Sequence, residues 1–399
     1  MRWQSWIFRG ADVLRVLVAH NSYQQRGGED SVVDSEIALL RARGNDVVEY
    51  RRNNDECREM NPLAVAVQAL WSRRSTTELT QLLRKARPDV VHVHNTFPLI
   101  SPSLYWTAAE ARVPVVQTLH NFRLMCLNGL FLRNGQICED CLGHLPWRGI
   151  MRKCYRGESA ASGVAASVLA LHRGLTTYRT KVSRYIALND FCRRKFIAAG
   201  LPAERIVIKP NFVDFPSPVE ALPRQGLLFV GRLSVEKGVQ TLAKAAALLP
   251  HAWFRVAGEG PEMNMLDGLT NITCLGSLPN VAVRQEMSRA VALVVPSICY
   301  ETFGLVIVEA FASGTPVLAS RIGVLPDLVR EGQTGICFEP GNSRDFADKM
   351  AWALAHPCEM AQMGRNARAH YEAEFSADKS YRLLMEIYKD VRDEQEEPS

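Results

Sequence analysis

The sequence predicts an α/β protein with two domains, each built around a parallel β-sheet. Short runs of strand-forming apolar residues recur along the chain and alternate with stretches of helical periodicity, which is the pattern of parallel sheets with crossover helices. The chain has 399 residues, of which 47% are hydrophobic and 22% are charged. This length exceeds one ordinary domain, and the apolar content is sufficient for two cores.

The expected strands form two groups on either side of a proline-rich segment. The first group is 13–20, 47–50, 90–94, 115–120 and 185–188, and the second is 227–230, 254–257, 272–275, 291–295 and 317–320. Prolines in the segment 209–223 predict a semi-stiff linker between the groups. We therefore expect a first domain over 1–210 and a second over 211–375. Residues 376–399 are expected to form a final helix and a charged tail, with 393–399 disordered.

The segment 296–310 places two carboxylates around a glycine turn between a strand and a helix. The helix is expected to begin near Gly304 and to end at Gly314, where a left-handed cap costs little. Unpaired N–H groups at a helix start bind phosphate without a metal. Glu301 lies in the turn and Glu309 lies inside the helix, so each would contact a different part of a ligand. Alone, this spacing is more typical of a capping carboxylate and a surface glutamate.

Two further loops favour a ligand site over this purely structural interpretation. The loop 231–238 follows a strand and carries Arg232 and Lys237. The planar guanidinium of an arginine and the compact ammonium of a lysine can together neutralise a diphosphate. The loop 256–261 also follows a strand and contains Glu259 between two glycines. All of these loops lie at the carboxyl ends of strands, where open parallel sheets bind ligands.

The order G-R-L-S-x-E-K-G, A-G-E-G-P and P-S-x-x-E-T-F-G-L-V-x-x-E-A resembles the nucleotide-sugar domain of the family 4 retaining glycosyltransferases. The first half is similar as well, in Gly27 and Gly28, the strand 89–94 and the segment 118–121. The resemblance spans nearly the whole chain. It implies the GT-B fold, in which two Rossmann-like domains with parallel sheets face each other across a cleft and the last helix crosses back to the first domain. We expect the aromatic segment 371–388 to make this crossing.

The resemblance also implies a role for each motif residue. Arg232 and Lys237 would bind the donor diphosphate, Glu309 the ribose hydroxyls, and Glu301 the donor sugar beside its reacting carbon. The backbone of Phe303, Gly304 and Leu305, with Glu259 nearby, would complete the donor pocket. Gly27 and Gly28 would approach the donor phosphate. His120 would face the donor sugar across the cleft and assist the oxocarbenium-like centre; the less favoured alternative is a satisfied core or loop histidine.

The activity implied is transfer of a sugar, with retention, from a UDP- or GDP-sugar to a glycan, lipid-linked or other hydroxyl acceptor, in polysaccharide or glycoconjugate biosynthesis. His120, Glu301, Arg232 and Lys237 are the expected catalytic residues. The resemblance implies chemistry that requires no cofactor, and the absence of an Asp-x-Asp metal motif from the chain agrees with it. The glycine loop also lacks a G-x-G-x-x-G fingerprint, which disfavours nicotinamide cofactors. Two alternatives remain: an epimerase or hydrolase of the same fold, and a non-catalytic nucleotide-sugar-binding subunit.

A cysteine-rich insertion over about 121–156 departs from the plain family pattern. It contains Cys126, Cys138, Cys141 and Cys154, with Cys138 and Cys141 in a C-x-x-C arrangement. Four thiolates would satisfy tetrahedral zinc in a structural site, whereas a single C-x-x-C with two loose partners is also compatible with buried free thiols. Both interpretations place the insertion at the acceptor side of the cleft.

The net charge of +5 is modest, but basic residues concentrate in two stretches of the first domain. They lie over 148–156 and 173–195, interleaved with Trp147, Tyr155 and Tyr178. Such a surface either contacts anionic lipid headgroups near a lipid-linked acceptor or is a solvated face. Residues 160–171 are too short to span a bilayer, and 1–6 lack the apolar core of a signal peptide. We expect a cytoplasmic protein, peripheral at the inner face of the membrane if the basic surface binds lipid, and no nucleic-acid partner.

Overall fold

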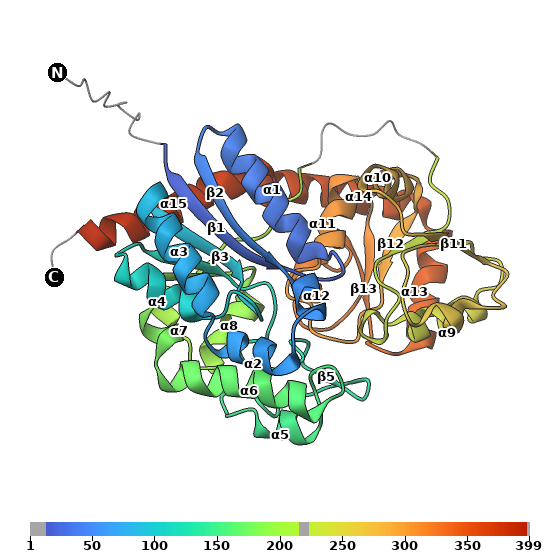
Figure 1. The fold of residues 1–399 in the computed structure, drawn as a ribbon. Helices are drawn as coiled ribbons and strands as arrows, with labels where there is room; N and C mark the ends of the chain where they lie inside the picture. The colour runs from blue at the N-terminus through green and yellow to red at the C-terminus, as the bar shows by residue number, and fades with distance from the viewer. Residues whose placement is uncertain (1–12, 215–222, 397–399) are drawn as a thin grey trace.

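The computed structural model describes residues 13–214 and 223–396, which form two separate parallel β-sheets with helices on their faces (Figure 1). The first sheet has six strands in the order β2-β1-β3-β4-β7-β8. Their bounds are β1 Arg15–Ser22, β2 Asp46–Asn53, β3 Val90–Asn95, β4 Val115–Thr118, β7 Arg184–Ala187 and β8 Ile206–Ile208. Every neighbouring pair in this sheet is parallel.

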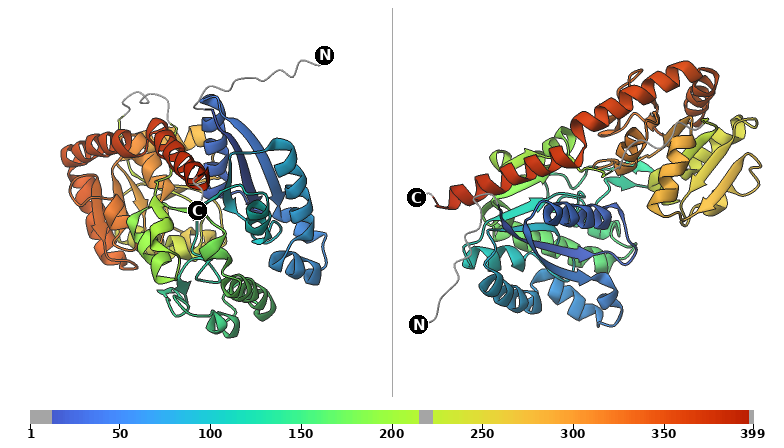
Figure 2. Two further views of the ribbon diagram at one scale, coloured as in Figure 1. Left: turned by 90° about the vertical axis from the view of Figure 1, so that its left-hand side faces the viewer. Right: turned by 90° about the horizontal axis from the view of Figure 1, so that it is seen from above.

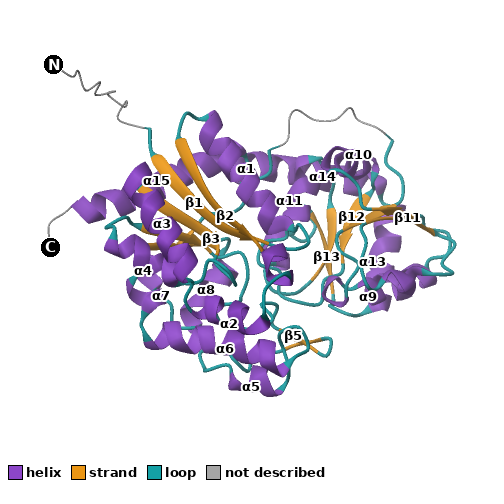
Figure 3. Ribbon diagram, in the orientation of Figure 1, coloured by secondary structure: helices purple, strands orange, loops and turns teal. Residues whose placement is uncertain are grey.

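The second sheet also has six parallel strands, in the order β11-β10-β9-β12-β13-β14. Their bounds are β9 Leu227–Val230, β10 Phe254–Ala257, β11 Ile272–Gly276, β12 Ala292–Val295, β13 Val317–Ser320 and β14 Gly335–Phe338. A small antiparallel hairpin of β5 Leu132–Arg133 and β6 Gln136–Ile137 lies apart from both sheets, in the cysteine-rich insertion (Figure 3).

Helices cover both faces of each sheet. Those around the first sheet are α1 Gly28–Ala42, α2 Pro62–Leu70, α3 Arg73–Ala86, α4 Ser103–Glu110, α5 Trp147–Met151, α6 Ser159–Gly174, α7 Thr177–Thr180 and α8 Asp190–Ala198. Those that follow the linker are α9 Val239–Leu248, α10 Asn280–Arg289, α11 Leu305–Ala312, α12 Leu325–Leu328, α13 Ser343–Ala355, α14 Pro357–Glu374 and α15 Ala377–Glu396. The central strands β3, β12 and β13 are buried along their whole length, as expected for parallel strands that are covered on both faces.

The last helix, α15, leaves the second domain and packs on the first sheet (Figure 2). Its residues Leu384, Ile387 and Tyr388 share one hydrophobic core with Val16 and Val90 of that sheet. The amphipathic pattern of α15 therefore buries its apolar side against a domain that lies more than 150 positions earlier in the chain. The crossing helix that the family resemblance implies is confirmed.

Three expectations differ from the structure. Strands β8 and β14 were not predicted, because β8 has only three residues and β14 begins with a glycine, so neither contains an apolar run longer than three residues. Residues 393–396 were expected to be disordered, which is wrong: α15 continues to Glu396, since Glu and Gln are good helix formers and Arg184 pairs with Glu394. Tyr371 belongs to α14 and stays with the second domain, where its hydroxyl donates to the Val213 carbonyl at 2.8 Å. The expectations for 1–12, 215–222 and 397–399 lie outside the described residues.

Candidate active site

A cavity of about 720 Å³ opens at the carboxyl ends of the strands of the second sheet. The loops after β9, β10 and β11 and the helices α10 and α11 form most of its wall, and Gln25 and Arg26 close it from the first domain. Of the expected donor-binding residues, Arg232, Glu259 and Glu309 line this cavity, and Lys237, Glu301 and His120 do not. The cavity therefore lies between the two domains and unites three of the motif side chains.

Arg232 follows β9 and is exposed in the cavity wall. Glu259 occupies the neighbouring loop, where its carboxylate accepts a long hydrogen bond of 3.4 Å from the Ser277 amide. Its backbone carbonyl accepts a hydrogen bond of 2.9 Å from the Leu233 amide, which ties the two loops together. The Arg232 guanidinium can therefore reach an anion in the cavity from a loop that is held in place.

Lys237 and Glu301 form an ion pair beside this cavity. The Lys237 ammonium lies 2.7 Å from Glu301 Oε1, and the Ser297 hydroxyl donates to the same oxygen at 2.7 Å. Burial raises the pKa of Glu301, but Lys237 and Ser297 outweigh it and hold that pKa below its usual value. Burial lowers the pKa of Lys237, and Glu301 in turn raises it above its usual value. Both groups are therefore charged at neutral pH.

A glycine makes this ion pair geometrically feasible. Gly238 has φ +71° and follows the 3₁₀ turn Val235–Lys237, so the chain doubles back after Lys237. A side chain at Gly238 would meet the carbonyl oxygen of Pro296 at 1.8 Å. Only glycine lets the loop after β9 approach the loop after β12 this closely, and the Ile298 amide then donates to the Glu236 carbonyl at 3.0 Å.

Helix α11 begins directly after Gly304, which has φ +81° and forms its N-cap. Phe303 is buried against Phe375, whereas Leu305 remains half-buried and approaches Gly28 of the first domain. The first turn of α11 therefore directs its unpaired amides toward the space between the domains. Gly27 and Gly28 are exposed, with Gly27 forming the N-cap of α1.

Glu309 lies half-buried on α11, between the large cavity and a second cavity of about 400 Å³ against α1. Burial raises the pKa of this carboxyl to about 7, and the nearby Arg284 offsets only part of the effect. A carboxylate with a raised pKa gains from hydrogen-bond donors that a ligand brings. Arg284 of α10 was not predicted as a site residue, because an arginine on an ordinary helix carries no local signal; the structure places it in the walls of both cavities.

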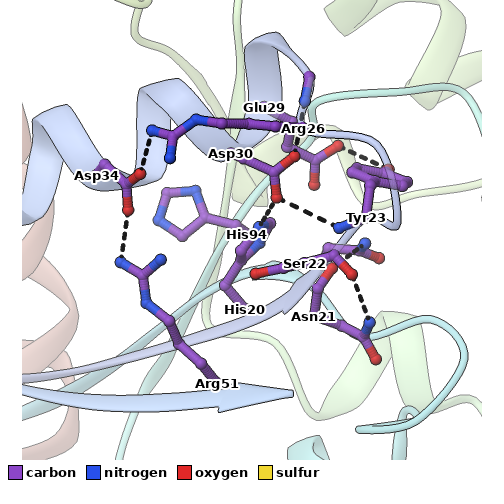
Figure 4. Close-up of polar contacts among 12 residues, drawn as sticks. His20, Asn21, Ser22, Tyr23, Arg26, Glu29, Asp30, Asp34, Arg51 and His94 are labelled. Atoms are coloured by element: carbon purple, nitrogen blue, oxygen red, sulfur yellow. Dashed lines mark hydrogen bonds and ion pairs between the residues drawn. The ribbon is translucent and has the colours of Figure 1, made fainter. Parts of the chain in front are cut away.

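The loop between β1 and α1 is held by a buried carboxylate that the sequence analysis also missed. Asp30 accepts hydrogen bonds from the Gly27 amide at 2.9 Å and the Tyr23 amide at 3.3 Å, and its other contact is His20 Nε2 at 2.9 Å (Figure 4). Arg26 pairs with Asp34, so its guanidinium is held beside the cavity mouth. The signal that the sequence offers is the position of Asp30 as the third residue of α1, where an acidic side chain can accept a hydrogen bond from the N-cap amide.

His120 lies at the end of β4 and is buried in the first domain, 9% exposed. Its backbone carbonyl accepts a hydrogen bond of 2.8 Å from the Thr302 hydroxyl, which joins it to the turn that carries Glu301. Thr302 also accepts at its carbonyl from Asn189 at 2.6 Å. These contacts cross between the domains and bring the turn that carries Glu301 against the segment that follows β4. Burial and His94 lower the pKa of His120 well below its usual value, which leaves the ring neutral.

The four cysteines of the insertion surround one small cavity of about 20 Å³. Cys138 and Cys141 follow the β5–β6 hairpin, while Cys126 and Cys154 come from flanking turns. The Cys126 thiol is turned aside and donates to Asn128 Oδ1 at 3.0 Å. Over residues 13–214 and 223–396, no three of the cysteine sulfurs lie within 4.8 Å of one another. The structure therefore gathers the four residues but does not draw their sulfurs into a tetrahedral arrangement.

Comparisons with solved structures identify the architecture. Sucrose-phosphate synthase from Thermosynechococcus elongatus superimposes with a TM-score of 0.71 at 18% identity, over 95% of this chain and 99% of that one. The Anabaena protein HepE in complex with UDP-glucose gives a TM-score of 0.63 at 18% identity, over 94% and 100%. The protein thus has the GT-B fold, as the sequence predicts.

Sequence comparisons then supply the family. Residues 27–211 match the glycosyl transferase 4-like domain, and residues 214–370 match the glycosyl transferases group 1. A glycogen synthase of Mycobacterium tuberculosis is 32% identical over 309 residues, which are 73% of this chain and 66% of that protein. A D-inositol 3-phosphate glycosyltransferase of Mycolicibacterium paratuberculosis is 28% identical over 320 residues, 75% of this chain and 66% of that protein. The chain belongs to the group 1 glycosyl transferases and matches just under two thirds of these relatives' length.

Proposed function

We propose that this chain is a retaining glycosyltransferase that moves a sugar from a nucleoside-diphosphate sugar, of uridine or guanosine, to a hydroxyl acceptor. The observation that carries the proposal is the 720 Å³ cavity at the strand ends, with Arg232 and Glu309 in its wall and the Lys237–Glu301 pair beside it. HepE, which shares the fold, was solved with UDP-glucose. We further propose a glycan or lipid-linked acceptor on the first domain and a role in polysaccharide or glycoconjugate synthesis.

In this proposal each charged group meets one part of the donor. Glu309 accepts hydrogen bonds from the ribose hydroxyls, and Arg232 binds the diphosphate. Lys237 and the amides at the start of α11 stabilise the charge on the departing phosphate, which supplies the electrostatic term without a metal ion. Glu301 lies 2.7 Å from Lys237 and would hold the sugar at the same place. The neutral His120 can face an oxocarbenium-like centre without repelling it, whereas an imidazolium could not.

The proposed chemistry can be tested without knowing the acceptor, because water replaces it slowly. The protein is incubated with UDP-α-glucose or GDP-α-mannose, and the released sugar is followed by proton NMR before mutarotation is complete. We expect the α anomer to appear first, since front-face attack retains configuration. Early release of the β anomer would contradict a retaining reaction. Conversion of the donor into a different nucleotide sugar would instead identify an epimerase, and binding without turnover would identify a non-catalytic subunit.

We also propose that Cys126, Cys138, Cys141 and Cys154 hold a structural zinc ion. A zinc–sulfur distance of about 2.3 Å would require the sulfurs to close around the small cavity, with Cys126 turning away from Asn128. Support comes from four thiols on one cavity and from the hairpin that precedes the C-x-x-C pair.

The purified protein should therefore contain one equivalent of zinc by mass spectrometry. Chelation, or the double substitution Cys138→Ser and Cys141→Ser, should lower Tm by several degrees while donor affinity changes little, because the ion only stabilises the insertion. Cys274→Ser with Cys358→Ser, two exposed cysteines elsewhere, is the matched control. Metal-free protein with an unchanged Tm would favour buried free thiols.

For the basic surface, we propose contact with anionic lipid at helix α5. Trp147, Met151 and the preceding Leu145 are 55%, 73% and 58% exposed, and Arg148 and Lys153 are exposed beside them. Apolar and basic side chains together suit a headgroup layer. The later part of the basic stretch does not support this role, because Arg184 and Lys195 pair with Glu394 and Glu139 and Tyr178 is buried. Within 13–214 and 223–396 no helix has the length and apolar character to cross a membrane.

A further inference from the structure

The ring of His120 makes a hydrogen bond that the proposed function does not use. His120 Nε2 lies 2.8 Å from His94 Nδ1, and the two rings stack with their centroids 5.1 Å apart. His94 is on β3, one strand away from the end of β4, and is 4% exposed. Each neutral imidazole has one N–H and one lone pair, so one ring of this pair must donate the hydrogen bond and the other must accept it.

The far side of His94 faces a buried carboxylate. His94 Nε2 lies 3.4 Å from Glu36 Oε1, and His92 Nδ1 lies 3.0 Å from the same buried oxygen. Glu36 comes from α1 and is 2% exposed. Burial raises the pKa of Glu36, but Lys209 and His92 outweigh it and hold the pKa well below its usual value, so the carboxylate is ionised. Burial lowers the pKa of His94 to about 3, so His94 is neutral at physiological pH.

These contacts determine where the protons lie. A bare lone pair on His94 Nε2 would point at a negative oxygen, so the single proton of His94 belongs on Nε2, toward Glu36. His94 Nδ1 is then an acceptor, and the proton of the hydrogen bond belongs to His120 Nε2. His120 has no second proton, because its pKa is lowered by burial and by His94. Its Nδ1 therefore keeps a lone pair.

We propose that Glu36 and His94 are positioning residues that lock His120 in its Nε2–H tautomer and so present Nδ1 as a hydrogen-bond acceptor to the donor sugar. This inference rests on the proposed function for its ligand, but the tautomer itself does not. An acceptor at Nδ1 suits a sugar hydroxyl, and a lone pair without positive charge suits an oxocarbenium-like centre. The reverse tautomer would present an N–H to both.

The surroundings of Glu36 support a hydrogen-bonded chain of Glu36, His94 and His120, here called the relay, rather than a metal site. Glu36, His92 and His94 place their ligand atoms within 4.8 Å of one another, as a cation site would. Lys209 Nζ, however, lies 3.1 Å from Glu36 Oε2 and already supplies the positive charge. His92 is held by Thr118 Oγ1 at 2.8 Å and by the Tyr388 hydroxyl at 2.6 Å. Each polar partner of the cluster is thus a protein group.

Two of those partners come from the segments that connect the domains. Lys209 directly follows β8 and is the first residue of the linker segment 209–223, and Tyr388 is on α15, which crosses back from the second domain. His20 of β1, which contacts Asp30, completes the set of titratable groups around the relay, edge-on to His94 with ring centroids 6.3 Å apart. Groups from β1, β3, α15 and the residue after β8 therefore surround the relay.

The direct test is the tautomer of His120 in the full-length protein without substrate. Histidine ring nitrogens are labelled with ¹⁵N, and long-range ¹H–¹⁵N correlation separates the protonated nitrogen from the bare one. The signal is assigned by its loss in His120→Gln. We expect a neutral Nε2–H ring that does not titrate between pH 6 and 8. A ring with its proton on Nδ1, or a charged ring at pH 7, would overturn the proposal.

A matched pair of variants connects the tautomer to turnover. In His94→Asn, the side-chain Oδ1 can accept the hydrogen bond from His120 Nε2–H in place of His94 Nδ1. In His94→Leu, the side chain has no acceptor. We expect His94→Leu to lose the Nε2–H tautomer and to lower kcat for donor hydrolysis roughly 10- to 100-fold, with KM nearly unchanged, and His94→Asn to recover most of both. Equal losses in the two variants with an unaltered His120 signal would contradict a positioning role. If no donor is turned over at all, the proposed function fails while the tautomer result still stands.

Discussion

Glu309→Ala is expected to abolish measurable donor binding while leaving the fold intact. The carboxylate would accept two hydrogen bonds from the ribose, each charge-assisted and worth roughly 1.5–3 kcal/mol, so the affinity should fall at least about 100-fold. The fold should tolerate the change, because Glu309 is a half-buried group whose pKa burial raises to about 7. Calorimetric titration measures the first effect and thermal unfolding the second.

The matched control for this prediction is Glu359→Ala, which removes an exposed glutamate from α14, away from the cavity. It should bind donor like the wild type. The same carboxyl also gives donor affinity a pH dependence. With a pKa of about 7 in the free protein, Glu309 is mostly ionised at pH 8 and mostly protonated at pH 6. Only the carboxylate accepts both hydroxyls, so Kd should rise roughly tenfold as the pH falls from 8 to 6. A steep dependence that persists in Glu309→Gln would contradict this assignment.

Lys237→Ala is expected to lower kcat for donor turnover by roughly 100- to 1,000-fold, the usual loss when one stabilising donor is removed from a developing anion. The ammonium lies 2.7 Å from Glu301, so the variant also leaves that buried carboxylate without its cation. The pKa of Glu301 should then rise, because burial is no longer opposed by Lys237.

Steady-state kinetics of donor hydrolysis check the Lys237 prediction, with Lys244→Ala on the exposed side of α9 as the control. Lys237→Arg should restore little, because a planar guanidinium does not fit the position of a compact ammonium between Glu301 and a phosphate. An unchanged kcat in Lys237→Ala would remove the residue from the catalytic machinery.

The fold was predictable because parallel strands that are buried on both faces are read directly as apolar runs. Strands β9, β10 and β13 fall on the predicted residues, and α11 begins after Gly304 as expected. From that framework follows the prediction that the motif loops share one edge of the sheet. The sequence could not show that Lys237 and Glu301 pair with each other, since the contact joins positions 64 residues apart and depends on Gly238 fitting against Pro296.

The relay that holds the His120 ring could not be predicted from the sequence either. His92 and His94 stand two positions apart on a buried strand and so lie on one face of it, but a histidine in an apolar run is indistinguishable from a satisfied core residue until its partners are known. Those partners, Glu36, Lys209 and Tyr388, come from three distant parts of the chain. Tertiary proximity, not local pattern, turns these side chains into a connected network.

We propose that the cavity between the domains binds a nucleoside-diphosphate sugar through Glu309. The most direct measurement is calorimetric titration of the wild-type protein and Glu309→Ala with a panel of UDP-, GDP-, ADP- and CMP-sugars. We expect saturable one-to-one binding of a UDP- or GDP-sugar by the wild type and none by the variant. Equal binding by both proteins would contradict the site, and binding of none of the four classes by the wild type would contradict the function.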